Sequence, residues 1–219
     1  MISSSRNKRP GTEGCGVRRR WRRTAATGSS SLDSPVFPSA MKMEESNLLR
    51  HPMTDEQWTK ATGLLSLSVK SMDGTTVRTL VESIFAGIQR IDPLMTAYCL
   101  QTCPSCSDPC CRGQDIYYNQ ADVLYLTALG DPVPPGQTRS SRHDPCRYLG
   151  PNGCVLPRTV RPYVCVWYLC ESHMDLFSDE PAGIQRSVVD TLRAIRFSRL
   201  SLEMLHEKEP FGTRNDRGR

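Results

Sequence analysis

Four cysteines lie within nine residues of this sequence, in the stretch CPSCSDPCC at positions 103–111, and two of them are adjacent. Thiolates at a C-x2-C spacing come close enough together to bind one Zn²⁺ ion or one iron–sulfur cluster. The same spacing also occurs in disulfide frameworks and in catalytic redox pairs. The surrounding sequence is therefore needed to distinguish metal binding, disulfide formation and redox catalysis.

A second cysteine-rich stretch follows 34 residues later, with the spacing C-x7-C-x10-C-x4-C. Eight thiolates would suffice for two four-thiolate sites, or for one site with spare thiols. The side chains of the adjacent Cys110 and Cys111 start in divergent directions, so we expect them to serve different centres or one of them to support the other. The candidate metal ligands are Cys103, Cys106, Cys110, Cys111, Cys146, Cys154, Cys165 and Cys170.

The cellular compartment separates metal binding from disulfide formation. The N-terminal segment lacks the apolar stretch of about 7–15 residues that a secretory or twin-arginine signal contains. We therefore expect a cytoplasmic protein, in which thiols are kept reduced and clustered cysteines bind metal. A catalytic C-x2-C pair belongs to a βαβ unit, and Cys103 and Cys106 have no such setting.

Residues beside the cysteines give further expectations. GPNGC at 150–154 is typical of a tight turn presenting Cys154, and Arg161 is placed to offset thiolate charge. We interpret Cys99 as the buried end of a helix, outside the ligand set. His143 and His173 each lie three residues from a cysteine and could be ligands of a mixed site, but with so many thiols available we expect both to be exposed loop residues.

Helix signals precede the cysteines. Thr54 and Gln57 match a capping box, which predicts a helix from there to about Val69. A second helix is predicted from Gly74, with apolar residues at three- and four-residue steps. Pro93 disturbs this pattern, since proline removes a backbone hydrogen bond within a helix.

Further helices are predicted between and after the cysteine stretches. Asn119 and Gly130 are suited to cap the two ends of the segment QADVLYLTAL. The segment 182–207 again has apolar residues at helical spacing. The sequence therefore predicts a mostly α fold, in which helices clamp two irregular cysteine-rich metal-binding loops.

The charge is unevenly distributed along the chain. Residues 1–40 hold eight of the 28 basic residues but only two acidic ones, whereas the rest carries 20 basic and 21 acidic residues. We expect 1–40 to be a disordered basic tail. This tail would be absent from the protein if translation started further downstream. Residues 41–219 would form the helical domain, with a metal-binding core at about 99–170. Because that domain is nearly neutral, nucleic acid is an unlikely partner, and no stretch reaches the ~18 apolar residues of a membrane span.

The order of these motifs resembles the YkgJ family of cysteine cluster proteins, which contain a CxxCxxCC zinc- or iron-chelating domain. The resemblance covers about residues 99–170, through CPSCSDPCC, CRYLGPNGC and RPYVC. It implies a metal centre, zinc or iron–sulfur, and a similar cluster occurs in flagellin lysine methylases. The matching residues are Cys103, Cys106, Cys110, Cys111, Cys146, Leu149, Gly153, Cys154, Arg161, Pro162 and Cys165.

Three functions are compatible with this pattern. The first is a metal-binding cysteine-cluster protein with a zinc or iron–sulfur cofactor and the metal ion as its partner. The second is an iron–sulfur oxidoreductase or a cluster-containing methyl transfer enzyme. The third is an interaction module stabilised by zinc, since closed four-thiolate zinc sites hold folds together. No protein partner, substrate or catalytic residue follows from the sequence.

Overall fold

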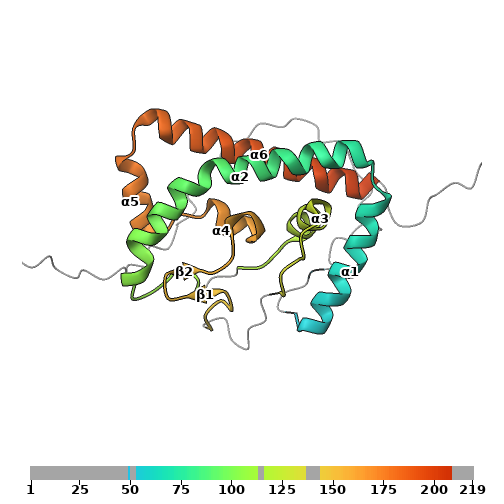
Figure 1. Cartoon of the computed structure of the whole chain (residues 1–219), viewed down its shortest axis with the longest axis horizontal. Helices are drawn as coiled ribbons and strands as arrows, with labels where there is room; N and C mark the ends of the chain where they lie inside the picture. The colour runs from blue at the N-terminus through green and yellow to red at the C-terminus, as the bar shows by residue number, and fades with distance from the viewer. Residues whose placement is uncertain (1–48, 50–52, 113–115, 137–143, 209–219) are drawn as a thin grey trace, which may run out of the picture.

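The computed structural model describes residues 49, 53–112, 116–136 and 144–208. The predicted tail at 1–40, with Cys15, lies outside this part of the chain, and so does His143. The described residues form a mostly α fold, as predicted (Figure 1). Its elements are α1 (Asp55–Ser71), α2 (Gly74–Thr102), η2 (Cys103–Ser105), α3 (Gln120–Leu129), β1 (Leu149–Gly150), β2 (Gly153–Cys154), η3 (Arg158–Val160), α4 (Tyr163–Trp167), α5 (Glu171–Asp179) and α6 (Ala182–Lys208).

The predicted helix starts are confirmed by their caps. The Gln57 backbone N–H donates to the Thr54 hydroxyl at 3.2 Å, and the Thr54 N–H donates to the Gln57 side chain at 2.9 Å. Asn119 and Asp122 form the same reciprocal box at the start of α3. Gly130 ends α3 in the left-handed region at φ 83°, which glycine adopts without steric cost. Short-range polar contacts thus define both helices.

Helix α2 continues through Pro93, where the sequence pattern was disturbed. Proline at 93 cannot donate to the carbonyl of Gln89, but both residues are exposed, so water can satisfy that carbonyl. Ile91, Met95 and Tyr98 continue the buried face on the other side of the helix. The helix therefore extends into the cysteine-rich region and ends directly before Cys103.

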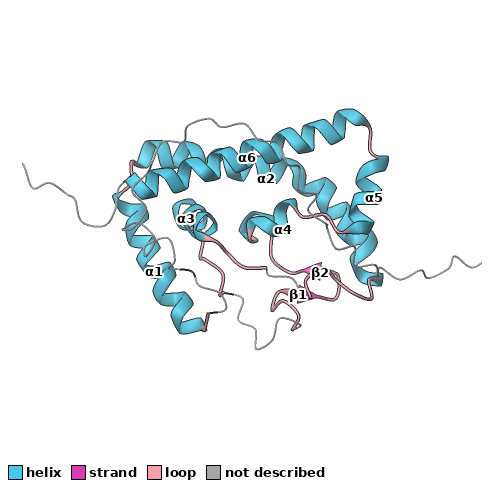
Figure 2. Ribbon diagram, turned by 180° about the vertical axis from the view of Figure 1, so that it is seen from behind, coloured by secondary structure: helices cyan, strands magenta, loops and turns pink. Residues whose placement is uncertain are grey.

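The core lies where α2 packs along α6. The two helices run side by side in opposite directions in both views (Figure 1, Figure 2). At Gly87 they approach so closely that an added Cβ would lie 2.6 Å from Cγ1 of the buried Ile195. The buried apolar residues of this core come mainly from α1, α2, α3 and α6, with Val166 added from α4, and they include Leu65, Val81, Ile84, Ile88, Ile91, Val123, Leu124, Leu126, Ile195 and Leu202.

A buried ion pair joins α3 to α6 and to the start of α4. Arg199 Nη1 lies 2.8 Å from Asp122 Oδ1, and both side chains are almost fully buried. The backbone N–H of Tyr163 donates to the same carboxylate at 3.0 Å, and the Arg199 guanidinium lies over the Tyr163 ring. A buried charge is tolerated when it is paired and hydrogen-bonded. These contacts hold the start of α4, the short helix that carries Cys165, against α3 and α6.

The second cysteine stretch contains more regular structure than predicted. The short antiparallel hairpin β1–β2 pairs Leu149 with Cys154 and Gly150 with Gly153. After it come η3, α4 and α5, and α5 was not predicted from the sequence. Within the described residues, no helix is both long enough and apolar enough to cross a membrane.

Candidate metal centre

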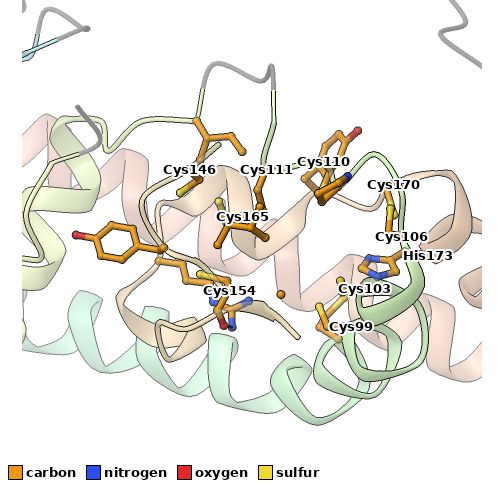
Figure 3. Close-up of a pocket in the computed structure, with 18 of the residues that line it drawn as sticks. Cys99, Cys103, Cys106, Cys110, Cys111, Cys146, Cys154, Cys165, Cys170 and His173 are labelled. Carbon is orange, nitrogen blue, oxygen red and sulfur yellow. Dashed lines mark hydrogen bonds between the residues drawn. The ribbon is translucent and has the colours of Figure 1, made fainter. Parts of the chain in front are cut away.

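One cavity of about 260 Å³ collects cysteines from both stretches. Its wall is formed by the end of α2, by η2, by the β1–β2 hairpin, and by α4 and the start of α5. None of the nine described cysteines is in a disulfide. The cysteines that line the cavity are Cys99, Cys103, Cys106, Cys110, Cys111, Cys146, Cys154, Cys165 and Cys170 (Figure 3). The structure thus places all eight predicted ligands around one space, together with Cys99.

Three potential metal-ligating atoms in this cavity lie close enough to one another to contact a single metal ion. The sulfurs of Cys99 and Cys103 and a ring nitrogen of His173 all lie within 4.8 Å of one another. Cys99 and Cys103 are four residues apart at the end of α2, so their side chains share one face of the helix. His173 comes from the first turn of α5. We call these three residues the mixed site.

Two expectations for the mixed site were wrong. His173 is not an exposed loop residue: it is 7% exposed and belongs to α5. Its Nε2 lies 2.8 Å from the Thr102 hydroxyl, which orients the ring. Burial lowers the pKa of His173, which favours the neutral imidazole that binds metals. Cys99 is the end of a helix, as predicted, but its thiol faces the cavity and is only half-buried.

A buried arginine, not singled out from the sequence, contacts the mixed site. Arg158 is 5% exposed, and its Nε pairs with Asp92 Oδ1 at 2.8 Å. Its Nη2 donates to the sulfur of Cys99 at 3.7 Å. A hydrogen bond from the Cys103 thiol, together with the charge of Arg158, lowers the pKa of Cys99 to about 5. The site therefore favours a thiolate at Cys99, which is the form that binds a metal ion.

Arg161 offsets negative charge at nearby thiols, as the sequence suggested, because its charge lowers the pKa of both Cys154 and Cys165. Its Nε donates to the carbonyl of Leu156 at 2.8 Å, and its Nη2 donates to the carbonyl of Cys154 at 3.4 Å. These bonds shape the loop that follows the hairpin. The Arg161 charge also opposes the burial that raises the pKa of the Cys154 thiol. Arg161 thus supports Cys154, while Arg158 supports Cys99.

Four further thiols gather on the other side of the cavity. Cys111 and Cys146 are joined by the backbone, since the N–H of Cys146 donates to the carbonyl of Cys111 at 3.0 Å. Burial raises the pKa of the Cys165 thiol, and negative charge at the other three thiols raises it further. We call this set the four-thiol site; in Figure 3 its members lie together, apart from the mixed site, and they are Cys111, Cys146, Cys154 and Cys165.

The adjacent cysteines lie at the boundary between these two groups. A hydrogen bond with the thiol of Cys111 and burial raise the pKa of Cys110, and charge at Cys111, Cys170 and Cys103 contributes to the shift. Cys111 also acts on Cys154 and Cys165. Figure 3 draws Cys170 and Cys106 near His173, and Cys110 beside Cys111. The two adjacent thiols are therefore hydrogen-bonded to each other, and each also interacts with different further cysteines.

The sequence contains a signal for the missed donors. Cys99 and Cys103 have the i, i+4 spacing of one helix face, and His173 follows Cys170 at i+3. This signal depends on knowing that α2 continues past Pro93 and that a helix begins after Cys170. A helix was expected to end near Cys99, but neither its continuation to Cys103 nor a helix after Cys170 was predicted, so the shared faces were not recognised.

Comparison with known proteins adds no assignment. No protein-family model, curated protein or solved structure matches the chain.

Proposed function

We propose that this chain is a zinc-binding cysteine-cluster protein, in which a zinc ion ties the end of α2 to the start of α5. The observation that carries the proposal is the 4.8 Å clustering of two thiols and one imidazole at the mixed site. Cysteine sulfur and histidine nitrogen are the donors of structural zinc sites, which are tetrahedral. The order of cysteines that resembles the YkgJ family supports the same proposal.

The donor set favours zinc over an iron–sulfur cluster. Clusters of the common types are held by four cysteine thiolates, whereas the mixed site combines sulfur with nitrogen. The fourth position is supplied by one of the thiols beside it, Cys106, Cys110 or Cys170. A closed site of this kind stabilises the fold and leaves no open position for a substrate. The proposed role is therefore structural, in a protein that presents other surfaces to its partners.

The support around the donors also fits zinc. Ligating histidines are usually oriented by a hydrogen bond at the other ring nitrogen. The Thr102 hydroxyl contacts His173 at Nε2, so Nδ1 is the ligand atom in the proposed site. Arg158 stabilises the thiolate of Cys99 and is itself anchored by Asp92. These contacts prepare the donors before the ion binds.

Elemental analysis of the full chain tests this proposal. The protein is purified without oxygen and without added chelator, and zinc, iron and acid-labile sulfide are measured together with the absorption spectrum. We expect colourless protein with stoichiometric zinc. Cys103→Ser should lose zinc, whereas the matched control Ser105→Ala, in the same turn but exposed, should keep it. Metal-free protein, or iron with sulfide and broad absorption near ~400 nm, would overturn the zinc proposal.

A further inference from the structure

We propose that a groove formed by α4, α6 and the start of α3 binds an acidic peptide segment of a protein partner. The groove has a volume of about 540 Å³, within the range of about 300–1,000 Å³ that binding pockets span. It shares no lining residue with the cysteine cavity. The inference therefore goes beyond the proposed function and does not depend on the bound metal.

Helix α4 forms one side of the groove, and Tyr163 holds this helix against α6. The Tyr163 hydroxyl donates to the carbonyl of Leu192 at 3.1 Å, and the guanidinium of Arg199 lies 4.4 Å from the centre of its ring. Trp167 follows four residues later, at the end of α4, and it is 45% exposed. The indole thus lines the groove from a helix that is fixed beside α6.

Helix α6 forms the other side, where an apolar stripe is left uncovered by the described part of the chain. Val189 and Leu200 line the groove, and both are exposed. Phe197 and Met204 lie three residues before and four residues after Leu200, which places them on the same side of the helix. They are 72% and 55% exposed. A contiguous exposed apolar surface of this kind marks a site of interaction with another molecule.

The charges in the groove indicate the chemistry of the partner. Arg193 and Arg196 line it from the same face of α6. Arg193 pairs with Asp190 at 3.2 Å on an exposed surface, where ion pairs are weak, and Arg196 forms no ion pair within the described residues. Glu203, the one acidic residue of the described lining, accepts a hydrogen bond from the backbone N–H of Ala121. Two guanidinium groups therefore remain available to carboxylates.

An acidic peptide complements both the charged and the apolar parts of the groove. Its carboxylates can pair with Arg193 and Arg196, since guanidinium groups bind carboxylates in a bidentate geometry. An aliphatic or aromatic side chain between them can pack against Trp167 and Leu200. The chain's own segment 1–40 does not have this chemistry, because it holds eight basic and only two acidic residues. A symmetric pair of chains would bring the arginines of both grooves towards each other.

Selection from a displayed library of random peptides, presented to the full, reduced and zinc-loaded chain, tests the inference. We expect the selected peptides to carry Asp or Glu beside an aliphatic or aromatic residue. The strongest binder is then synthesised with a fluorescent label, and its affinity is measured by anisotropy. Affinity should fall at least about tenfold in Arg196→Glu, where like charges oppose each other, and about tenfold in Trp167→Ala. Arg78→Glu is the matched control, since Arg78 is exposed on α2 and lines neither cavity.

The alternative outcomes identify other occupants of the groove. Selected peptides without acidic residues, or equal affinities of Arg196→Glu and Arg78→Glu, would overturn the inference. An oligonucleotide that displaces the peptide with the same affinity would also overturn it, because the groove would then be a general anion site. Sedimentation that shows self-association, lost in Arg196→Glu, would assign the groove to a second copy of the chain instead. Zinc is measured in every sample, and a chain that binds the peptide but no zinc would overturn only the proposed function.

Discussion

Arg158 shows how one side chain prepares the donors at the residue scale. It is buried, it is anchored by Asp92, and it reaches the sulfur of Cys99 and the carbonyl of Cys165 with different nitrogens. It therefore connects Cys99, at the end of α2, to α4, the helix that carries Cys165. The sequence motif RPYVC draws attention to Arg161, whereas no motif marks Arg158, three residues earlier.

Replacing this arginine should weaken zinc binding without removing a ligand. In Arg158→Met, Cys99 loses the cation that favours its thiolate, and we expect zinc affinity to fall roughly 10–100-fold, as for other groups that support metal ligands. Competition with a chromophoric chelator measures the change. Arg193→Met is the control, since Arg193 is exposed and pairs only within its own helix, with Asp190. Equal affinities for the two variants would contradict this role.

At the element scale, the packing of α2 against α6 positions the cysteine cavity. Helix α2 carries Cys99 at its end, and its register against α6 depends on the close approach at Gly87. Ile195, which Gly87 faces, is 1% exposed. Because buried helices are closely packed, even one added methyl group at such a contact forces a shift.

We expect Gly87→Ala to destabilise the fold by roughly 1–3 kcal/mol through overpacking, despite the higher helix propensity of alanine. The control is Gly63→Ala in α1, where an added Cβ meets no atom within 4 Å. That substitution should stabilise the fold by about 0.5–1 kcal/mol, the usual gain from replacing glycine in a helix. Urea denaturation measures both free energies of unfolding. Equal effects of the two substitutions would rule out the close contact.

Elements with local signals could be predicted from the sequence, and those that depend on tertiary packing could not. The capping residues Thr54 and Asn119 define the starts of α1 and α3. By contrast, α2 passes Pro93 because its opposite face is buried, and α5 follows Cys170, which makes no side-chain capping bond. The cysteines of the cavity were visible in the sequence, but His173 was missed because its helix was missed.

At the scale of the whole molecule, we expect hydrophobic burial to stabilise the helices and metal binding to stabilise the cysteine segments. The apolar core of α1, α2, α3 and α6 is continuous, and hydrophobic burial of this kind stabilises a fold without metal. The cysteine segments, drawn below α2 in Figure 1, consist of short turns, a two-pair hairpin and the five-residue helix α4. Their thiols repel one another when ionised, so metal binding is the interaction that would order them.

Chelation should therefore affect the two parts differently. We expect zinc removal to abolish hydrogen-exchange protection in peptides from 103–112 and 144–170, while peptides from 77–91 keep theirs. Helical circular dichroism should remain largely unchanged, since most helical residues lie in the apolar core. Exchange measured with and without chelator, in the presence of reductant, makes the comparison. Unchanged protection in the cysteine segments would argue against a structural metal.

The ligand shell of the bound metal tests the central claim most directly. X-ray absorption at the zinc edge of the full purified chain reports the atoms around zinc. We predict a shell dominated by sulfur at about 2.3 Å, with a minor nitrogen contribution at about 2.0–2.1 Å. A shell of nitrogen and oxygen alone, without sulfur, would contradict the assignment of zinc to the cysteine cavity.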